Sequence, residues 1–145
     1  MKKIYQFLLF AAILVFTATS CVPEIERVKK STDFKYKLEK ALFYYEKENY
    51  TDAQTLFEDV MPFYRGSANA EEIAWHYANC SYSLREYTTS AYYFKQFTNT
   101  FPNSKYNEDA TYMIASAFDK LAPNQMLDQE NTRKAIEAYQ LFINT

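Results

Sequence analysis

The sequence predicts an all-α fold, an α-solenoid of stacked helical hairpins, and three observations support that prediction. Small residues recur with a period of 37 residues, so that Ala41, Ala78 and Ala115 occupy equivalent positions. The 145-residue chain contains 1 glycine and 4 prolines, too few for the many turns of an all-β fold. Its 14 tyrosines and 12 phenylalanines supply large side chains that pack between helices. A fixed period of this length is typical of solenoids built from helix pairs.

Residues 1–20 have the pattern of a secretory signal peptide. Two lysines precede an apolar run at residues 4–16, which is too short for a comfortable membrane span. Small residues follow, and Cys21 comes directly after them. This order resembles a bacterial lipoprotein signal, although Ala18 stands where the usual signal has leucine. It predicts that the leader is removed and that Cys21 becomes an acylated N-terminus, a lipid anchor to a membrane. The alternative is an ordinary signal peptide cleaved nearby, with Cys21 incidental.

Beyond the leader, the chain divides into a short tether and a repeat domain. Residues 21–32 hold the lipidated cysteine and a polar stretch without periodicity, for which we expect a flexible tether. The repeat domain is predicted over residues 33–145, with repeats at about 33–66, 68–104 and 107–145. Thr145 falls at the end of a predicted helix with no polar closing helix after it. We therefore expect a fragment whose continuation holds further repeats.

Apolar and small residues mark the faces where two helices meet in each of the first two repeats. We expect the first repeat to start at Thr32 or Asp33, with one helix ending near Lys47 and a second at about residues 51–63. The second repeat is expected over residues 70–102, with a break at Arg85 and Glu86. The inward residues predicted by helical spacing are Ala41, Tyr44, Ala53, Phe57 and Val60, and then Ala74, Tyr77, Ala78, Ser81, Ser90, Phe94 and Phe97.

The third repeat carries an insertion between its two helices. Its first helix is expected from Asn107 or Glu108 to Leu121, with Ile114, Ala115 and Phe118 inward. Ala135, Tyr139 and Phe142 match Ser90, Phe94 and Phe97 at a shift of 45 residues, so about eight residues are inserted between the two helices. The insertion lies within residues 122–131, where Asp128 and Asn131 are candidate helix starts. Insertions between repeat helices often carry contacts.

The composition offers no case for a catalytic, metal-binding or cofactor-binding site. The net charge of −2 gives no electrostatic basis for binding nucleic acid. His76 is the only histidine, and no cysteine or carboxylate lies at metal-ligand spacing from it, so it is interpreted as a packing or surface residue. The paired acids at residues 71–72 and 108–109 sit at predicted helix starts, where they favour the helix dipole. Cys80 is expected to be a small buried apolar residue.

A peptide-binding groove is predicted on the first helices of the three repeats. In a stack of hairpins, one side of each first helix packs on its own hairpin and the adjacent side lines a concave face. By this register, the groove residues are Leu38, Leu42, Tyr45, Trp75, Asn79, Tyr82, Tyr112 and Ser116. Aromatic and leucine side chains along such a groove suit an extended peptide that ends in aromatic residues. The alternative is that these residues form the core between repeats.

The repeat pattern of small residues, tyrosine, phenylalanine and proline resembles the tetratricopeptide repeat in a 37-residue version. The lipoprotein signal, the three repeats, Tyr112-Met113 and the pattern from Asp128 through Thr132, Ala135 and Tyr139 to Phe142 together resemble the BamD family. That resemblance implies a lipid-anchored scaffold on the periplasmic face of the outer membrane, which helps to insert β-barrel proteins. It further implies two partners, unfolded outer-membrane proteins and a barrel-forming assembly subunit with periplasmic domains.

Two other functions fit a lipoprotein with helical repeats. One is capture of a nutrient such as a glycan, and the other is coordination of envelope or cell-wall growth. An enzyme is disfavoured, because no nucleophile, base and orienting group are grouped in the sequence.

Overall fold

The computed structural model describes residues 24–122 and 129–144, and within these ranges every regular element is a helix. The signal peptide and Cys21 lie outside the described residues. The chain divides into two compact units, residues 1–30 and residues 31–145. The described part of the first unit is helix α2, Glu24–Lys30. The all-helical architecture of the second unit confirms the fold class that the periodicity predicts.

The presence of α2 differs from the flexible tether expected over residues 21–32. The charges of this segment suit a helix, because Glu24 and Glu26 lie in its first turn and Lys29 and Lys30 in its last. Val28 is the only buried residue of this helix. A single buried position gives no apolar periodicity from which the sequence could predict a helix.

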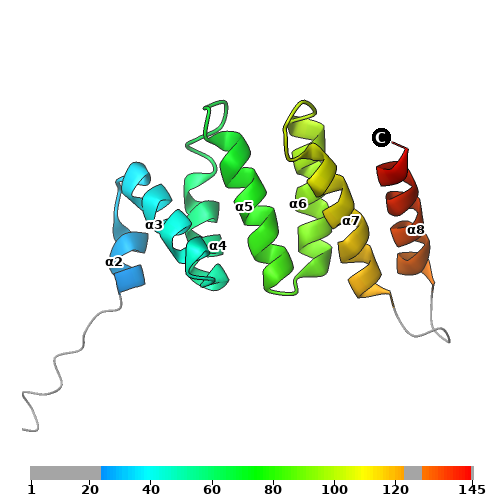
Figure 1. Ribbon diagram of the computed structural model, residues 1–145. Coiled ribbons are helices and arrows are strands. Elements are labelled where there is room, and N and C mark those ends of the chain that lie inside the picture. Colours follow the sequence, from blue (N-terminus) through cyan, green and yellow to red (C-terminus); the bar gives the residue numbers. More distant parts are fainter. Residues whose placement is uncertain (1–23, 123–128, 145) are drawn as a thin grey trace, which may run out of the picture. The chain divides into compact units, whose positions relative to one another are not determined.

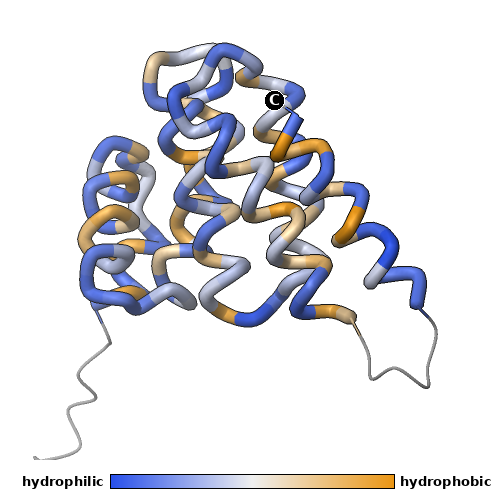
Figure 2. The backbone as a smooth tube through the Cα atoms, turned by 45° about the vertical axis from the view of Figure 1, so that its right-hand side comes forward, coloured by the Kyte–Doolittle hydropathy of each residue, from blue (hydrophilic) through white to orange (hydrophobic). Residues whose placement is uncertain are grey.

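The second unit is a row of three antiparallel helical hairpins (Figure 1). The most extensive packing is between helices that are consecutive in the chain. Apolar segments of the backbone tube lie where neighbouring helices meet (Figure 2). The hairpins pair α3, Phe34–Glu46, with α4, Tyr50–Val60; α5, Ala70–Ser83, with α6, Tyr87–Thr100; and α7, Asn107–Leu121, with α8, Glu130–Ile143.

The tight turns of the first two hairpins are built in the same way. Glu48 and Arg85 both adopt the left-handed conformation, with φ of 58° and 64°. The backbone N–H of Glu48 donates to the Tyr45 carbonyl, and that of Arg85 donates to the Tyr82 carbonyl, each over 2.9 Å. Because the two turns are separated by the same 37 residues as the alanines, the period describes a repeated structure as well as a repeated pattern.

The core lies between the paired helices, as the helical spacing predicts. Phe57 and Phe94 are fully buried, and Phe97 is 1% exposed. The small residues Ala41 and Ala78 are also fully buried, which allows the helices to approach closely. Other predicted inward residues are only half-buried, namely Ala74, Ile114, Phe118, Tyr139 and Phe142.

Two helix boundaries differ from the expectation or refine it. Helix α4 ends at Val60 and not near Phe63, because Pro62 has no N–H and its ring clashes with the preceding turn of a helix. In contrast, Asp33 caps α3 as expected, since its carboxylate accepts hydrogen bonds from the backbone N–H groups of Lys35 and Tyr36, each at 3.0 Å.

The insertion in the third repeat is only partly described, because residues 123–128, including Asp128, lie outside the described ranges. Asn131 lies in the first turn of α8 and does not cap it. Its side-chain amide donates instead to the Leu121 carbonyl at the end of α7, over 3.3 Å. Asn131 therefore joins the two helices on either side of the insertion.

Candidate functional site

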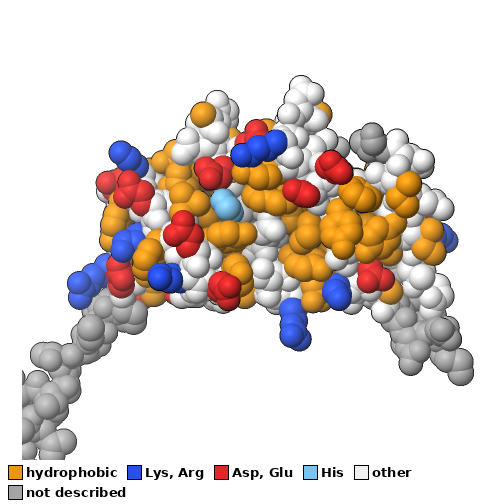
Figure 3. All heavy atoms as spheres, in the orientation of Figure 1, with side chains coloured by type: hydrophobic (Ala, Val, Ile, Leu, Met, Phe, Trp, Pro, Cys, Tyr) orange, Lys and Arg blue, Asp and Glu red, His pale blue; other side chains and the backbone are white. Residues whose placement is uncertain are grey.

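The candidate site is the face formed by the first helices of the hairpins, α3, α5 and α7, which we call the aromatic face. All eight groove residues predicted from the sequence belong to these helices. Figure 3 shows hydrophobic side chains spread across this face, with the single histidine, His76, among them. The contacts of each predicted residue decide whether its side chain is committed to packing or available to a ligand.

At the N-terminal end of the aromatic face, Tyr45 joins the first hairpin to the second. Leu38 is only 6% exposed, and Leu42 is half-buried. The Tyr45 ring lies 4.3 Å from the His76 ring of α5, and its edge faces Phe57 of α4 at 6.4 Å. Burial raises the pKa of the Tyr45 hydroxyl to about 12, with smaller contributions from Cys80 and Tyr50. At this end of the face, the Tyr45 ring packs between two repeats and Leu38 is buried, so neither side chain is free to bind a ligand.

His76 is part of that same packing cluster. Its ring stacks on Phe57 with an interplanar angle of 13° and a centroid distance of 5.7 Å. Its Nε2 is 3.7 Å from a carboxylate oxygen of Glu72, one turn earlier in α5, while its Nδ1 is buried without a hydrogen-bond partner among the described residues. Burial lowers the pKa of His76, and the Glu72 carboxylate opposes that shift. A neutral imidazole therefore suits the site.

Trp75 joins the second hairpin to the third. Its ring stacks on Tyr106 at 4.8 Å with an interplanar angle of 10°, and it meets Phe94 edge-on at 5.5 Å. These rings lie against the core cluster that contains Ala78, Phe94, Phe97 and Ala110. The side-chain amide of Asn79, one turn later, donates to the Trp75 carbonyl over 2.8 Å and so is engaged within its own helix.

Tyr82 and Ser116 form a direct bond between α5 and α7. Their hydroxyl oxygens are 2.7 Å apart, and Ser116 is 8% exposed. The Tyr82 ring also meets Tyr87 edge-on at 5.3 Å. This pair fixes the spacing of two neighbouring first helices.

Tyr112 differs from the other predicted aromatic residues, because its side chain is 46% exposed. It still lies beside the rings of Tyr139 and Phe142 of α8, with centroid distances of 6.1 and 5.7 Å. The three rings form an aromatic cluster on α7 and α8, which we call the Tyr112 cluster. Its central ring is open to a ligand.

Comparison with known proteins provides the family. Residues 31–145 match the protein family YfiO, described as an outer membrane lipoprotein. The chain belongs to this family. A relative from Aquifex aeolicus (strain VF5), described as a putative outer membrane protein assembly factor BamD, is 26% identical to it over 133 residues. That match covers 89% of this chain but 43% of the relative, so the chain spans less than half of the relative's length. The resemblance to the BamD family is thereby confirmed.

Within the described residues, no group of three or more histidine, cysteine or acidic side chains is arranged to hold a metal ion. Cys80 is a free, fully buried thiol, and burial raises its pKa to about 12, so it is held protonated and inert. In the same part of the chain, no helix is long and apolar enough to cross a membrane.

Sequence reasoning identified the helices of the aromatic face but missed two features of it. Tyr106, which stacks on Trp75, precedes α7 and has no counterpart one period earlier, so periodicity could not reveal it. Tyr139 and Phe142 were expected to be inward like Phe94 and Phe97, yet they are half-buried beside Tyr112. The 45-residue shift that placed them is the one signal that set this hairpin apart.

Proposed function

We propose that this protein is a lipid-anchored adaptor in the assembly of outer-membrane β-barrel proteins, and that it binds unfolded segments of those proteins. Membership of an outer membrane lipoprotein family supports the location, and the relative described as an assembly factor supports the process. In this proposal Cys21 carries the anchor, the repeats lie on the periplasmic side, and the chain is not an enzyme. A barrel-forming subunit with periplasmic domains is the proposed partner in the assembly machinery.

The observation that carries the binding proposal is the exposed Tyr112 ring within its aromatic cluster. Strands of a membrane barrel alternate apolar and polar side chains. An unfolded segment of this kind, when extended, therefore presents its apolar side chains on one face. An aromatic ring that is rigidly supported offers a large apolar contact, and a tyrosine adds a hydroxyl for hydrogen bonding. The rings of Tyr139 and Phe142 lie beside the Tyr112 ring and support it.

The other predicted groove residues have a different place in this proposal. Packing between the hairpins is the role of Tyr45, Trp75 and Tyr82, and their half-buried rings extend the contact surface away from Tyr112. Leu38 and Ser116 are buried and support that surface from below. Leu42 and Asn79 lie on the same face and complete it. The ligand contact is therefore concentrated at α7 and α8 and weaker toward α3.

The test compares Tyr112→Ala with Tyr92→Ala, in binding of a labelled peptide of alternating apolar and polar residues that ends in phenylalanine. Tyr92 is a matched control, because it is 62% exposed and lies on α6. We expect Tyr112→Ala to weaken binding about tenfold, the loss of one well-placed aromatic contact of about 1.4 kcal/mol. Tyr92→Ala should bind as the unmodified protein does. Equal binding by both variants and the unmodified protein would refute the role of the Tyr112 cluster.

The same assay separates nutrient capture from assembly. Maltoheptaose added as a competitor should leave peptide binding unchanged, because the hydroxyls of Tyr82 and Ser116 on this face already bond each other over 2.7 Å and are engaged before a sugar arrives. Displacement of the peptide by the oligosaccharide would favour the nutrient-capture function instead.

A further inference from the structure

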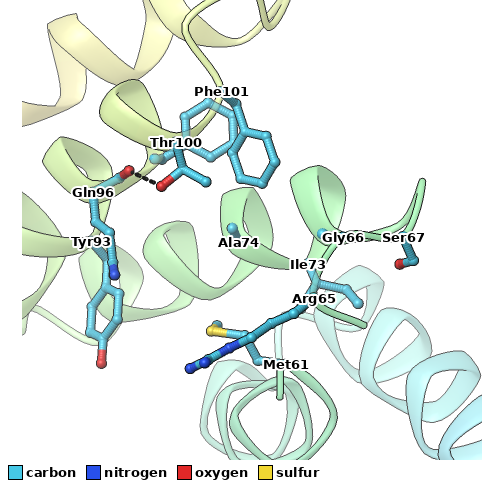
Figure 4. A pocket seen from close by; sticks show the side chains of 12 residues that line it. Met61, Arg65, Gly66, Ser67, Ile73, Ala74, Tyr93, Gln96, Thr100 and Phe101 are labelled. Atoms are coloured by element: carbon cyan, nitrogen blue, oxygen red, sulfur yellow. Dashed lines mark hydrogen bonds between the residues drawn. The ribbon is translucent and has the colours of Figure 1, made fainter. Parts of the chain in front are cut away.

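A second candidate site lies on α4, α5 and α6, away from the aromatic face. It is a cleft of about 610 Å³, and its walls come from the end of α4, the following loop and α6, while α5 forms its floor (Figure 4). Its volume falls within the range of about 300–1,000 Å³ found for ligand pockets. None of the predicted groove residues lines it.

The local sequence explains why the cleft is open. Pro62 ends α4 early, and the loop that follows turns at Gly66, whose φ of 76° is a left-handed conformation that favours glycine. No neighbouring atom lies within 4 Å of the position that a Gly66 side chain would occupy, so the loop stands clear of the helices there. Ala74 on the floor contributes only a methyl group, which leaves the space between α4 and α6 unfilled.

The walls of the cleft are apolar, and its rim carries one unpaired cation. Met61, Ala74 and Phe101, which are half-buried, line the interior. The Arg65 side chain runs beside Met61 toward the wall formed by α6 (Figure 4). Among the described residues, none forms an ion pair or hydrogen bond with its guanidinium group. An unpaired guanidinium beside an apolar surface is suited to a carboxylate that accompanies an apolar group.

An aromatic ring on the α6 wall of the cleft is held by a neighbouring tyrosine. Tyr93, on the α6 wall, meets the ring of Tyr77 edge-on at 4.6 Å. Burial raises the pKa of Tyr77, and hydrogen bonding to Tyr93 and the charges of Glu58 and Glu86 raise it further. The Tyr77 hydroxyl therefore stays protonated and uncharged at neutral pH.

A free amide lies beside the cleft as well. The side chain of Gln96 has no hydrogen-bond partner among the described residues and offers both a donor and an acceptor. That combination matches a peptide backbone, which carries one N–H and one carbonyl per residue. A lipid acyl chain would leave this amide unused.

We propose that this cleft binds a segment of a partner protein that presents one large apolar side chain with an acidic side chain close beside it. The apolar side chain packs on Ala74 and Phe101, the carboxylate pairs with Arg65, and Gln96 bonds the backbone. This site is separate from the Tyr112 cluster and goes beyond the proposed function, because it recognises an internal acidic segment and not an unfolded strand ending in an aromatic residue.

The test is selection of random dodecapeptides from a display library by the mature, detergent-solubilised protein. Selected peptides are then synthesised with both ends blocked, so that no terminal carboxylate can contribute. Arg65→Gln removes the cation, and Thr100→Trp fills the cleft from an exposed rim position. Lys95→Gln and Thr88→Trp are matched controls, because both are exposed residues of α6 that do not line the cleft.

We expect selected peptides to carry a large apolar residue within three positions of an aspartate or glutamate. Their affinity should fall about tenfold in Arg65→Gln, be abolished in Thr100→Trp, and remain unchanged in both controls. Replacing the peptide's acid by its amide should weaken binding to the unmodified protein but not to Arg65→Gln, which isolates the charge pair.

Several outcomes would overturn the proposal. These are no enrichment of peptides, enrichment without acidic residues, or equal binding by Arg65→Gln. Binding of oleate that Thr100→Trp abolishes, without any selected peptide, would assign the cleft to a lipid. Peptides that Tyr112→Ala releases but Thr100→Trp does not would belong to the aromatic face, so the two proposals can fail independently.

Discussion

Replacing Trp75 by alanine separates a packing role from a binding role on the aromatic face. The Trp75 ring contacts Tyr106, Phe94 and Phe97, with centroid distances of 4.8, 5.5 and 5.7 Å. Aromatic pairs contribute about 0.5–1.5 kcal/mol each beyond their buried area, and truncating a buried tryptophan costs about 3–5 kcal/mol. Because Trp75 is half-buried, we expect a loss of about 3 kcal/mol in the free energy of unfolding.

Tyr112→Ala is the matched comparison. Tyr112 is 46% exposed and contacts two rings at 5.7 and 6.1 Å, so its removal should cost only about 1 kcal/mol. Trp75→Phe keeps an aromatic ring in place and should also cost about 1 kcal/mol.

The assay is urea unfolding followed by far-ultraviolet circular dichroism, because Trp75→Ala removes the single tryptophan and with it the fluorescence signal. With a denaturant slope of about 1.5 kcal/mol per molar urea, the unfolding midpoint of Trp75→Ala should fall by about 2 M, and that of Tyr112→Ala by less than about 1 M. If the two variants unfold at the same midpoint, Trp75 is not the inter-repeat core residue that its contacts indicate.

Three further predictions concern the histidine, a partly buried ion pair and the anchor. Because burial lowers the pKa of His76 below its ordinary value of 6.5, the unfolded chain takes up that proton first. The contribution of His76 to stability should therefore be complete above pH 6.5 and should fall as the pH drops below 6.5. Thermal melts between pH 5 and 8 should show this dependence in the unmodified protein and not in His76→Phe. Asp59→Asn should cost about 1–3 kcal/mol in urea unfolding, because the Lys37 ammonium it pairs with at 2.8 Å has a side chain only 7% exposed and cannot regain full hydration. Cys21→Ser should move the protein from the membrane to the soluble fraction of lysed cells, and continued sedimentation with membranes would contradict a lipid anchor at that residue.

Helix boundaries were largely predictable, because they depend on local chemistry. The start of α3 at the Asp33 cap and the bounds of α5 and α7 follow from caps, acidic first turns and helical spacing. The exceptions have local causes too. Pro62 shortens α4, and α2 forms from a segment whose charges suit a helix but whose single buried residue gives no period.

The state of each residue on the aromatic face was not predictable in the same way. Helical spacing places Trp75 and Tyr112 on equivalent first helices, and both are aromatic. Whether such a ring is covered depends on residues that arrive from elsewhere, as Tyr106 does against Trp75. The cleft on α4, α5 and α6 was missed for the same reason, since its walls come from segments without a shared pattern.

The sequence by itself determined the stride of the repeat, the pairing of helices and the identity of their buried small residues. These features are local or periodic, and the 3.6-residue turn of a helix converts them directly into faces. Only the tertiary structure decided which aromatic rings pack between hairpins and which remain exposed to solvent. That decision depends on the angle and distance between neighbouring hairpins, because a ring is buried only when another segment closes over it.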